Sequence, residues 1–486
     1  MMERMTNLPL EPPNRHSHTG FLFLSLLLFV VLAIACLLPI QPNDYWWYVR
    51  VGRDMAAQVG IPATEALSYT QAGQPVVYQT WLAALTFWGV DALGGAALTN
   101  LLRAALVGGF VLFLWLSLRE AGAGPKLASL LSLLAALAGS SNWAMRPQLF
   151  AYPLFGIALW TLVRWQKGER KTLWLLPFLA AAWVNLHGSF ILLFFLLAAA
   201  LAAGKGDRRR LVLVAVLTLL ASFLNPQGAG EWGHALSLVQ NPTSALFSTE
   251  WRPPVNQGWQ MNLFFLWLLV LPVLTGFAPN KPEALHWLWF LGFGWMALSG
   301  LRYVIWFTAI LALLSAVMLS AWIGGKVDRP GSFSRAAPNL TIGIFLLLLP
   351  LALLPGVRES WWKGAPPALS ENTPVEAARW LGAHPELRGP LFSELAFSSY
   401  LTAALPQRPV WIHTRFETFP PQQFSRYLEI SNAAPDWQEQ LDAERINLLF
   451  LSLKDQPLLV SAAERSPLWR QVYRDERAVI FIRSGP

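Results

Sequence analysis

Cysteine and charge are both scarce in this chain. Cys36 is the only cysteine among 486 residues, which excludes an intramolecular disulfide framework. Cys36 lies inside an apolar run, so it does not indicate whether the protein is in an oxidising or a reducing compartment. Charged residues make up only 13% of the chain, whereas 55% is hydrophobic and the mean hydropathy is +0.41. This balance excludes a soluble protein of this size and predicts an integral membrane protein.

The basic residues indicate orientation rather than a nucleic-acid partner. The formal net charge is +8 and the pI is about 9.7. No nucleic-acid-binding motif is present, and Lys and Arg stand in short clusters between apolar runs, where they report topology in the bilayer. Nucleic acid is therefore excluded as a partner, and membrane lipids are expected.

The first apolar run is predicted to cross the membrane. Residues 1–20 are polar and are expected to form a disordered cytoplasmic tail, and residues 21–40 are long enough to span. Residues 33–36 faintly resemble a lipoprotein cleavage box. Further apolar residues and more membrane segments follow, however, so we expect an uncleaved anchor.

The positive-inside rule sets the predicted topology. If residues 81–93 spanned, the basic clusters at 167–171 and 205–210 would lie outside, so 81–93 is predicted to lie on or dip into the outer face. The second span then covers residues 96–118. Further spans, about eleven in all, are expected at residues 125–140, 147–165, 172–186, 189–204, 210–224, 260–277, 284–299, 302–323 and 340–355. The connections at 164–171, 205–210 and 326–335 are then cytoplasmic, and those at 41–95, 141–146, 186–188, 225–259 and 300–302 are external.

Charged and polar residues return after about residue 355. Residues 356–486 are enough for one small domain, in which β-prone and helical stretches alternate. The β-prone stretches are 390–392, 409–413, 448–451 and 478–482, and the helical ones include 374–381 and 436–444. The predicted fold class is a polytopic α-helical membrane protein, with a transmembrane domain over 21–355 and a C-terminal extracytoplasmic mixed α/β domain.

Polar residues near the predicted outer face form the candidate site. The span interiors are nearly free of ionisable residues, with Arg103 an exception, which argues against a transport pathway at the midplane. The loop after the first span reads QPNDYWWYVRVGRDM and combines acids, bases and flat rings, which suit a charged lipid headgroup and a sugar. Together with the other external connections it supplies Asp44, Trp46, Trp47, Arg50, Arg53, Asp54, Arg146, His187, Glu250, Arg252 and Arg302.

Each candidate also has a structural interpretation. Asp44 can cap the helix that follows it, the tryptophan pair fits an aromatic belt, and Arg50 and Arg53 can bind lipid phosphate non-specifically. His187 is favoured as a helix-end hydrogen-bonding residue, because no second His or Cys stands at metal-ligand spacing. The coincidence of these residues on one face is the stronger signal.

Short motifs along the chain resemble bacterial membrane proteins of the glycosyltransferase type C (GT-C) superfamily. Relatives in that superfamily include protein O-mannosyltransferases, oligosaccharyltransferases and lipid A aminoarabinose transferases. The motifs are Asp44-Tyr45-Trp46-Trp47, Gly52-Arg53, Ile61-Pro62, Ser68-Tyr69-Thr70, Arg146-Pro147-Gln148, Trp183-Val184-Asn185-Leu186-His187-Gly188-Ser189, Asn225-Pro226-Gln227-Gly228, Gly389-Pro390-Leu391-Phe392 and Tyr400-Leu401.

This resemblance implies transfer of a sugar from a polyprenyl-phosphate carrier to an acceptor on the outer face, usually with inversion. In such enzymes an acidic residue of the first external loop activates the acceptor or helps to bind a divalent cation, Mg²⁺ or Mn²⁺, and this role maps onto Asp44. A carboxylate can take the acceptor's proton while cations stabilise the departing phosphate. The guanidinium candidates for the phosphate are Arg50, Arg53, Arg146 and Arg302.

Two positions depart from similar loops. Residues 140–148 contain no Asp or Glu, where many GT-C enzymes carry an acidic pair, and Tyr48 stands where His is frequent. Glu250 is the candidate for the missing carboxylate. The remaining alternative is that this chain is an inactive member of the superfamily.

The resulting hypothesis is a hexosyl- or pentosyltransferase of a bacterial inner membrane, with a glycan, lipid or protein acceptor. Its N-terminus would be cytoplasmic and its C-terminal domain extracytoplasmic. The alternative is a non-enzymatic membrane protein that binds or moves a lipid-linked glycan.

Overall fold

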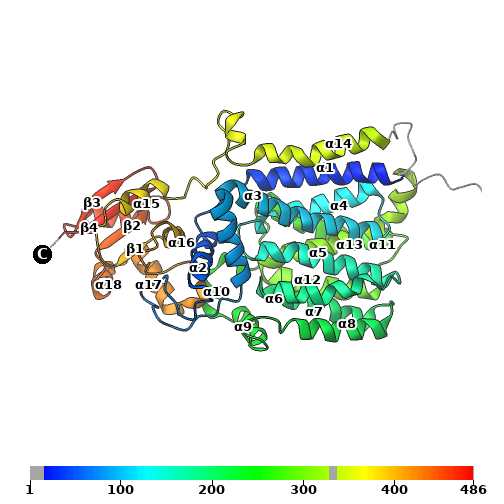
Figure 1. Cartoon of the computed structure of the whole chain (residues 1–486), viewed down its shortest axis with the longest axis horizontal. Helices are drawn as coiled ribbons and strands as arrows, with labels where there is room; N and C mark the ends of the chain where they lie inside the picture. The colour runs from blue at the N-terminus through cyan, green and yellow to red at the C-terminus, as the bar shows by residue number, and fades with distance from the viewer. Residues whose placement is uncertain (1–15, 328–335, 485–486) are drawn as a thin grey trace, which may run out of the picture.

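The structure is a computed structural model that describes residues 16–327 and 336–484. Apolar helices run side by side along the long axis, and a small sheet lies at one end of the molecule (Figure 1). The helices of this bundle are α1 (His16–Leu37), α3 (Trp81–Glu120), α4 (Pro125–Ala138), α5 (Gln148–Gln166), α6 (Leu175–Val184), α7 (Ile191–Ala203), α8 (Arg208–Ala221), α11 (Gly258–Phe277), α12 (Ala284–Ser299), α13 (Val304–Val327) and α14 (Ala336–Leu348).

Helices form where the apolar runs predicted them. Within the described residues, four helices are long and apolar enough to cross a membrane: Gly20–Leu37, Trp81–Glu120, Gly258–Phe277 and Leu301–Trp322. Shorter apolar helices, such as Pro125–Ala138, lie beside them in the bundle. The total of about eleven crossings stays a prediction, because a bundle packed in protein can contain apolar helices too short to span alone.

Helix α1 begins before the predicted span. Helix α1 begins at His16, so residues 16–20 are helical and continuous with the first apolar run. Residues 1–15 of the predicted tail, and residues 328–335 of the predicted basic connection at 326–335, lie outside the described part of the chain.

Helix α3 is bent where the sequence analysis separated an outer helix from a span. The bend is at Gly95, whose φ of 52° and ψ of −142° are accessible to glycine and strained for other residues. The part of α3 before the bend lies beside α2 (Asp44–Gln58), and the part after it joins the bundle (Figure 1). The sequence thus predicted the break correctly, and α3 holds α2 against the end of the bundle.

Gly52 allows α2 and α3 to approach closely. A Cβ at this position would lie 2.1 Å from Ala84 O and 2.8 Å from Trp88 Cβ, so one of the helices would have to move. We expect Gly52→Ala to lower the free energy of unfolding by about 1–3 kcal/mol, as overpacking does. Thermal unfolding in detergent measures this loss.

Gly89→Ala is the matched control, since Gly89 is likewise inside a helix, α3, and nothing stands within 4 Å of its added Cβ. This variant should unfold at the wild-type temperature or slightly above it. Equal behaviour of the two variants would mean that α2 does not depend on close contact at Gly52.

Four strands form the sheet at the end of the molecule, in the order β1-β2-β4-β3. Strand β1 (Leu391–Ser393) pairs in parallel with β2 (Leu448–Ser452), and β4 (Ala478–Arg483) pairs antiparallel with both β2 and β3 (Trp469–Arg474). The helices around this sheet are α15 (Val375–Gly382), α16 (Leu395–Ala404), α17 (Pro421–Ser431), α18 (Trp437–Ala443) and α19 (Pro457–Arg465).

One expected strand does not form, and one strand that does form was not predicted. Residues 409–413 are not a strand, because Val410 donates its N–H to Leu67 O at 2.9 Å and forms only isolated bridges, to Ser68 and Leu391. These bonds connect the segment to the loop after α2. Strand β3 was not predicted, because its sequence WRQVYR is polar and half of its side chains are exposed at a sheet edge.

Candidate active site

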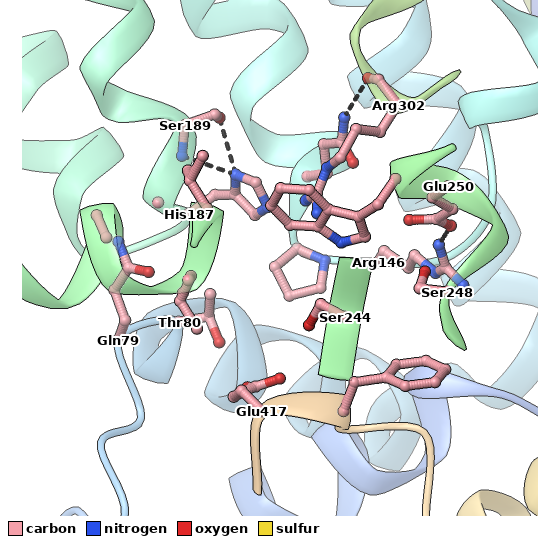
Figure 2. A pocket seen from close by; sticks show the side chains of 18 of the residues that line it. Gln79, Thr80, Arg146, His187, Ser189, Ser244, Ser248, Glu250, Arg302 and Glu417 are labelled. Carbon is pink, nitrogen blue, oxygen red and sulfur yellow. Dashed lines mark hydrogen bonds and ion pairs between the residues drawn. The ribbon is translucent and has the colours of Figure 1, made fainter. Parts of the chain in front are cut away.

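A cavity of about 610 Å³ lies where the bundle meets the segments on the sheet side. Polar side chains face it from several elements (Figure 2). The short helices α9 (Gly230–Val239) and α10 (Pro242–Phe247) lie at the same end of the bundle (Figure 1). The predicted site residues that line the cavity are Asp44, Trp47, Arg146, His187, Glu250 and Arg302.

Helix α2 turns one face toward this cavity. Asp44, Trp47 and Tyr48 stand at positions i, i+3 and i+4 of the helix, which share one side, and all of them line the cavity. On another side, Tyr45 is fully buried and donates to Asp91 Oδ1 at 3.1 Å. The buried tyrosine thereby fixes the rotation of α2 that presents Asp44.

Asp44 does not cap α2, so the capping interpretation is wrong. Asn43 occupies the N-cap position, no side chain makes a capping hydrogen bond there, and Asp44 is the first residue of the helix. Its Oδ2 lies 2.9 Å from Arg146 Nε, and its Oδ1 accepts a hydrogen bond from Thr414 Oγ1. The carboxylate is thus held at the cavity by two partners from distant parts of the chain.

Arg146 joins two carboxylates. It precedes α5 and pairs with Asp44 through Nε and with Glu250 through Nη1. The three side chains keep 20–30% of their surface exposed, so the cluster faces the cavity and is partly shielded from water. Glu250 comes from the short turn Thr249–Trp251. The structure therefore pairs the carboxylates of Asp44 and Glu250 with the guanidinium of Arg146, whereas the sequence placed these residues only at the same depth in the membrane.

The two carboxylates do not fit a divalent cation as they are arranged. The described part of the chain contains no group of three or more His, Cys, Asp or Glu side chains that could hold a metal ion. Mg²⁺ is usually held by one or two carboxylates that are free to coordinate it, with water in its other positions. Here the guanidinium of Arg146 pairs with both Asp44 and Glu250, so Arg146 supplies the positive charge at that point.

Arg302 is a cation at the cavity that has no ion-pair partner among the described residues. Its guanidinium lies 4.5 Å from the centre of the Trp251 ring, and its main-chain oxygen accepts from Gln148 Nε2 at 3.1 Å. The ring and the main chain thus position Arg302 while its N–H groups are left for a ligand. A planar guanidinium of this kind matches the oxygens of a phosphate.

His187 lies at the cavity beside a short helical turn. Its Nδ1 accepts from Ser189 N at 3.0 Å, which makes it the cap of the turn Gly188–Phe190, as its structural interpretation predicted. Burial, and then the nearby Arg302 guanidinium, lowers the pKa of His187 to about 3. The imidazole is therefore neutral, and with Nδ1 as acceptor its hydrogen is on Nε2, where it can be donated.

The segment before α17 adds an ion pair that the sequence analysis missed. Arg415 Nε donates to Glu417 Oε1 at 2.8 Å, and its guanidinium lies 5.6 Å from the centre of the Trp47 ring. Burial alone would raise the pKa of Glu417, but the charge and hydrogen bond of Arg415, together with a main-chain hydrogen bond and the nearby His413, lower it. Both residues line the cavity. The sequence signal that could have identified this pair is two charged residues, Arg415 and Glu417, soon after the apolar segment 409–413.

Apolar side chains also line the cavity. Three elements contribute them: α7, α9 and α12. These side chains are Ile191, Leu192, Phe195, Ala235, Leu236, Leu238, Val239, Trp295 and Met296. A ligand that fits this cavity therefore combines a charged part with an apolar part.

The structure does not bring the other candidates to the cavity. Arg50 pairs with Asp54 at 2.7 Å and donates to the main-chain oxygens of Thr402 and Pro406. This contact fastens α2 to α16. The remaining residues outside the lining are Trp46, which packs edge-on against Tyr400, and the exposed Arg53 and Arg252.

No protein-family model matches this sequence, and no curated protein matches it. Solved structures do match nearly the whole chain. The Archaeoglobus fulgidus oligosaccharyltransferase, tethered with an acceptor peptide containing the NVT sequon, is 13% identical with a TM-score of 0.59, over 97% of this chain and 74% of its own.

Two bacterial structures give comparable agreement. ArnT from Cupriavidus metallidurans, bound to undecaprenyl phosphate, is 13% identical with a TM-score of 0.50, over 95% of this chain and 97% of its own. The arabinofuranosyltransferase AftD from Mycobacteria is 16% identical with a TM-score of 0.55, over 98% of this chain and 42% of its own. At identities this low, the matches show a shared fold and nothing more.

Proposed function

From the GT-C fold that this chain shares with those three glycosyltransferases, we propose that it is a membrane glycosyltransferase. The proposed donor is a sugar linked to a polyprenyl phosphate, and the proposed acceptor is an envelope glycan, lipid or protein. We place the reaction on the outer face of a bacterial inner membrane, with the C-terminal sheet on the same side. The ArnT structure contains undecaprenyl phosphate, and another structure of the Archaeoglobus fulgidus oligosaccharyltransferase contains a dolichol-phosphate, which supports this donor class.

The observation that carries this proposal is that charged and apolar side chains line the same cavity. Asp44, Arg146, Glu250 and Arg302 line one cavity with the apolar side chains of α7, α9 and α12. A polyprenyl phosphate likewise combines a charged phosphate with an apolar hydrocarbon chain.

The proposed chemistry follows from the placement of charge. The acceptor hydroxyl attacks the anomeric carbon of the donor, its proton passes to the Asp44 carboxylate, and the bond from the anomeric carbon to the phosphate oxygen breaks. The polyprenyl phosphate leaves with the electron pair. Arg302 and the Nε2–H of His187 stabilise the negative charge on the leaving phosphate, because both donors are fixed before the reaction begins. Attack opposite the leaving group inverts the anomeric configuration.

The test is a transfer assay with purified protein, radiolabelled polyprenyl-phosphate sugars and a crude envelope acceptor fraction. Transfer of label to the acceptor supports the enzyme. Saturable donor binding without transfer from any donor of a broad panel would favour a protein that binds or moves a lipid-linked glycan. The same preparation serves both measurements, so the two functions are separated directly.

Arg302→Gln should lower the transfer rate by about 100-fold, the usual effect of removing one fixed donor from a developing negative charge. The matched control is Arg252→Gln, because Arg252 lies on the neighbouring segment, is exposed and does not line the cavity. We expect the control to keep the wild-type rate within about twofold. Similar losses in both variants would contradict a specific phosphate role for Arg302.

A further inference from the structure

A second cavity, of about 350 Å³, lies at the end of the bundle far from the sheet. It is formed where α3 and α5 end, where α12 begins, and beside the loop that joins α11 to α12. Its lining consists of Ala121, Val163, Gln166, Lys167, Pro279, Asn280, Lys281, Glu283, Leu285, His286, Trp289, Val317 and Ser320. No residue of the candidate active site belongs to it, so it requires a separate explanation.

Two lysines give this cavity positive charge. Lys167 has no ion-pair partner among the described residues. Lys281 Nζ donates to Thr275 O and, at 3.3 Å, to Gly276 O, both main-chain oxygens near the end of α11. These bonds hold the ammonium group at the cavity without neutralising it, since carbonyl oxygens carry no net charge. An ammonium group has three N–H donors, so one is left for a ligand.

The only carboxylate in the lining, Glu283, is already neutralised. Lys205 Nζ lies 3.1 Å from Glu283 Oε1, and Gln166 Nε2 donates to Glu283 Oε2. Because Lys205 balances Glu283, the charges of Lys167 and Lys281 remain uncompensated among the described residues. The cavity therefore favours an anion.

Neutral donors stand beside the two lysines. His286 Nδ1 accepts the main-chain N–H of Glu283 at 3.2 Å, so the ring hydrogen of a neutral His286 is on Nε2. The side-chain amide of Asn280 also belongs to the lining. Two cations together with an imidazole and an amide donor suit the several oxygens of a phosphate group better than they suit a halide ion.

The surroundings favour a lipid as the source of that phosphate. Exposed apolar side chains stand close in sequence to the lining residues, with Phe277 at the end of α11 exposed by 76% and Leu288 and Leu291 of α12 by 40% and 63%. Such side chains need a cover of hydrocarbon in a membrane protein. We propose that the second cavity binds the phosphate group of an anionic phospholipid, whose acyl chains lie against these side chains of α11 and α12.

The test is native mass spectrometry of the full chain in detergent, titrated with phosphatidylglycerol or with phosphatidylcholine of the same acyl chains. We expect saturable binding of one phosphatidylglycerol molecule and weaker binding of phosphatidylcholine. Lys167→Gln/Lys281→Gln should weaken phosphatidylglycerol binding by about 30-fold, because each lysine near an anionic lipid contributes about 1 kcal/mol.

Lys171→Gln/Arg209→Gln is the matched control, since both residues are exposed, are close in sequence to the basic segments at the same end of the bundle, and do not line the cavity. It removes the same charge and should leave the affinity within about twofold. An equal loss in the control, or equal binding of the two lipids, would overturn a specific site. Glycerol 3-phosphate or inorganic phosphate binding as tightly as the lipid would show a site for free phosphate and would overturn the lipid proposal.

Discussion

Asp44→Asn is expected to lower the rate of sugar transfer by about 100-fold or more, the range of a lost general base. The amide oxygen of Asn can still accept from Thr414 Oγ1, and the size of the side chain hardly changes, so the fold should be kept. An amide cannot take the acceptor's proton and cannot form the ion pair that Asp44 makes with Arg146. Initial rates of label transfer at saturating donor measure the effect.

The control for Asp44 is Asp54→Asn in the same helix. Asp54 pairs with Arg50 and does not line the cavity, so its loss changes charge in α2 without changing the proposed base. We expect transfer within about twofold of wild type, because Asp54 does not line the cavity and the amide oxygen of Asn can still accept from Arg50 Nε. Donor binding should be saturable in both variants. Near-normal transfer by Asp44→Asn would mean that Asp44 only positions Arg146 and Thr414.

The parts of this site that depend on apolar runs and helix ends were predictable from the sequence. Asp44, Arg146 and Glu250 stand in three separate connections between apolar runs, so the sequence placed them at one depth, and the structure joins them through Arg146. Their actual contact depends on how the bundle helices are arranged around one another. That arrangement is set by long-range packing, which no local pattern encodes.

Helix periodicity could have separated the useful residues of α2 from the others. Asp44, Trp47 and Tyr48 share the cavity side, whereas Arg50 and Asp54 lie on a side that contacts the chain near Thr402. The sequence analysis treated the whole stretch as one polar cluster. Counting positions i, i+3 and i+4 from Asp44 would have excluded Arg50 and Asp54 and included Tyr48.

Arg415 and Glu417 show where sequence reasoning ends. They are more than 350 positions from Asp44 in the chain, yet Thr414, their neighbour, bonds to the Asp44 carboxylate. Residues 409–413 looked like a strand because they are apolar, but their main chain bonds to the loop after α2. That unexpected pairing is what brings Arg415 to the cavity. A local strand prediction could not show which partner the segment would choose.

Arg146→Ala is expected to create a site for a divalent cation. In the wild type the guanidinium pairs with both Asp44 and Glu250, and its removal leaves both carboxylates without that cation. Oxygen ligands of this kind suit Mn²⁺. We therefore expect stoichiometric Mn²⁺ binding by the variant, followed by electron paramagnetic resonance, and none by the wild type at the same concentration.

Activity gives the second readout of the same change. Wild-type transfer should be insensitive to EDTA, because Arg146 already supplies the positive charge between the carboxylates. Arg146→Ala should lose about 100-fold in EDTA, as expected for a lost electrostatic contact, and Mn²⁺ should restore part of that loss. Arg146→Ala/Glu250→Gln should neither bind Mn²⁺ nor be restored, since one carboxylate is gone. Tight Mn²⁺ binding by the wild type, or its inactivation by EDTA, would show that a metal acts beside Arg146 rather than being replaced by it.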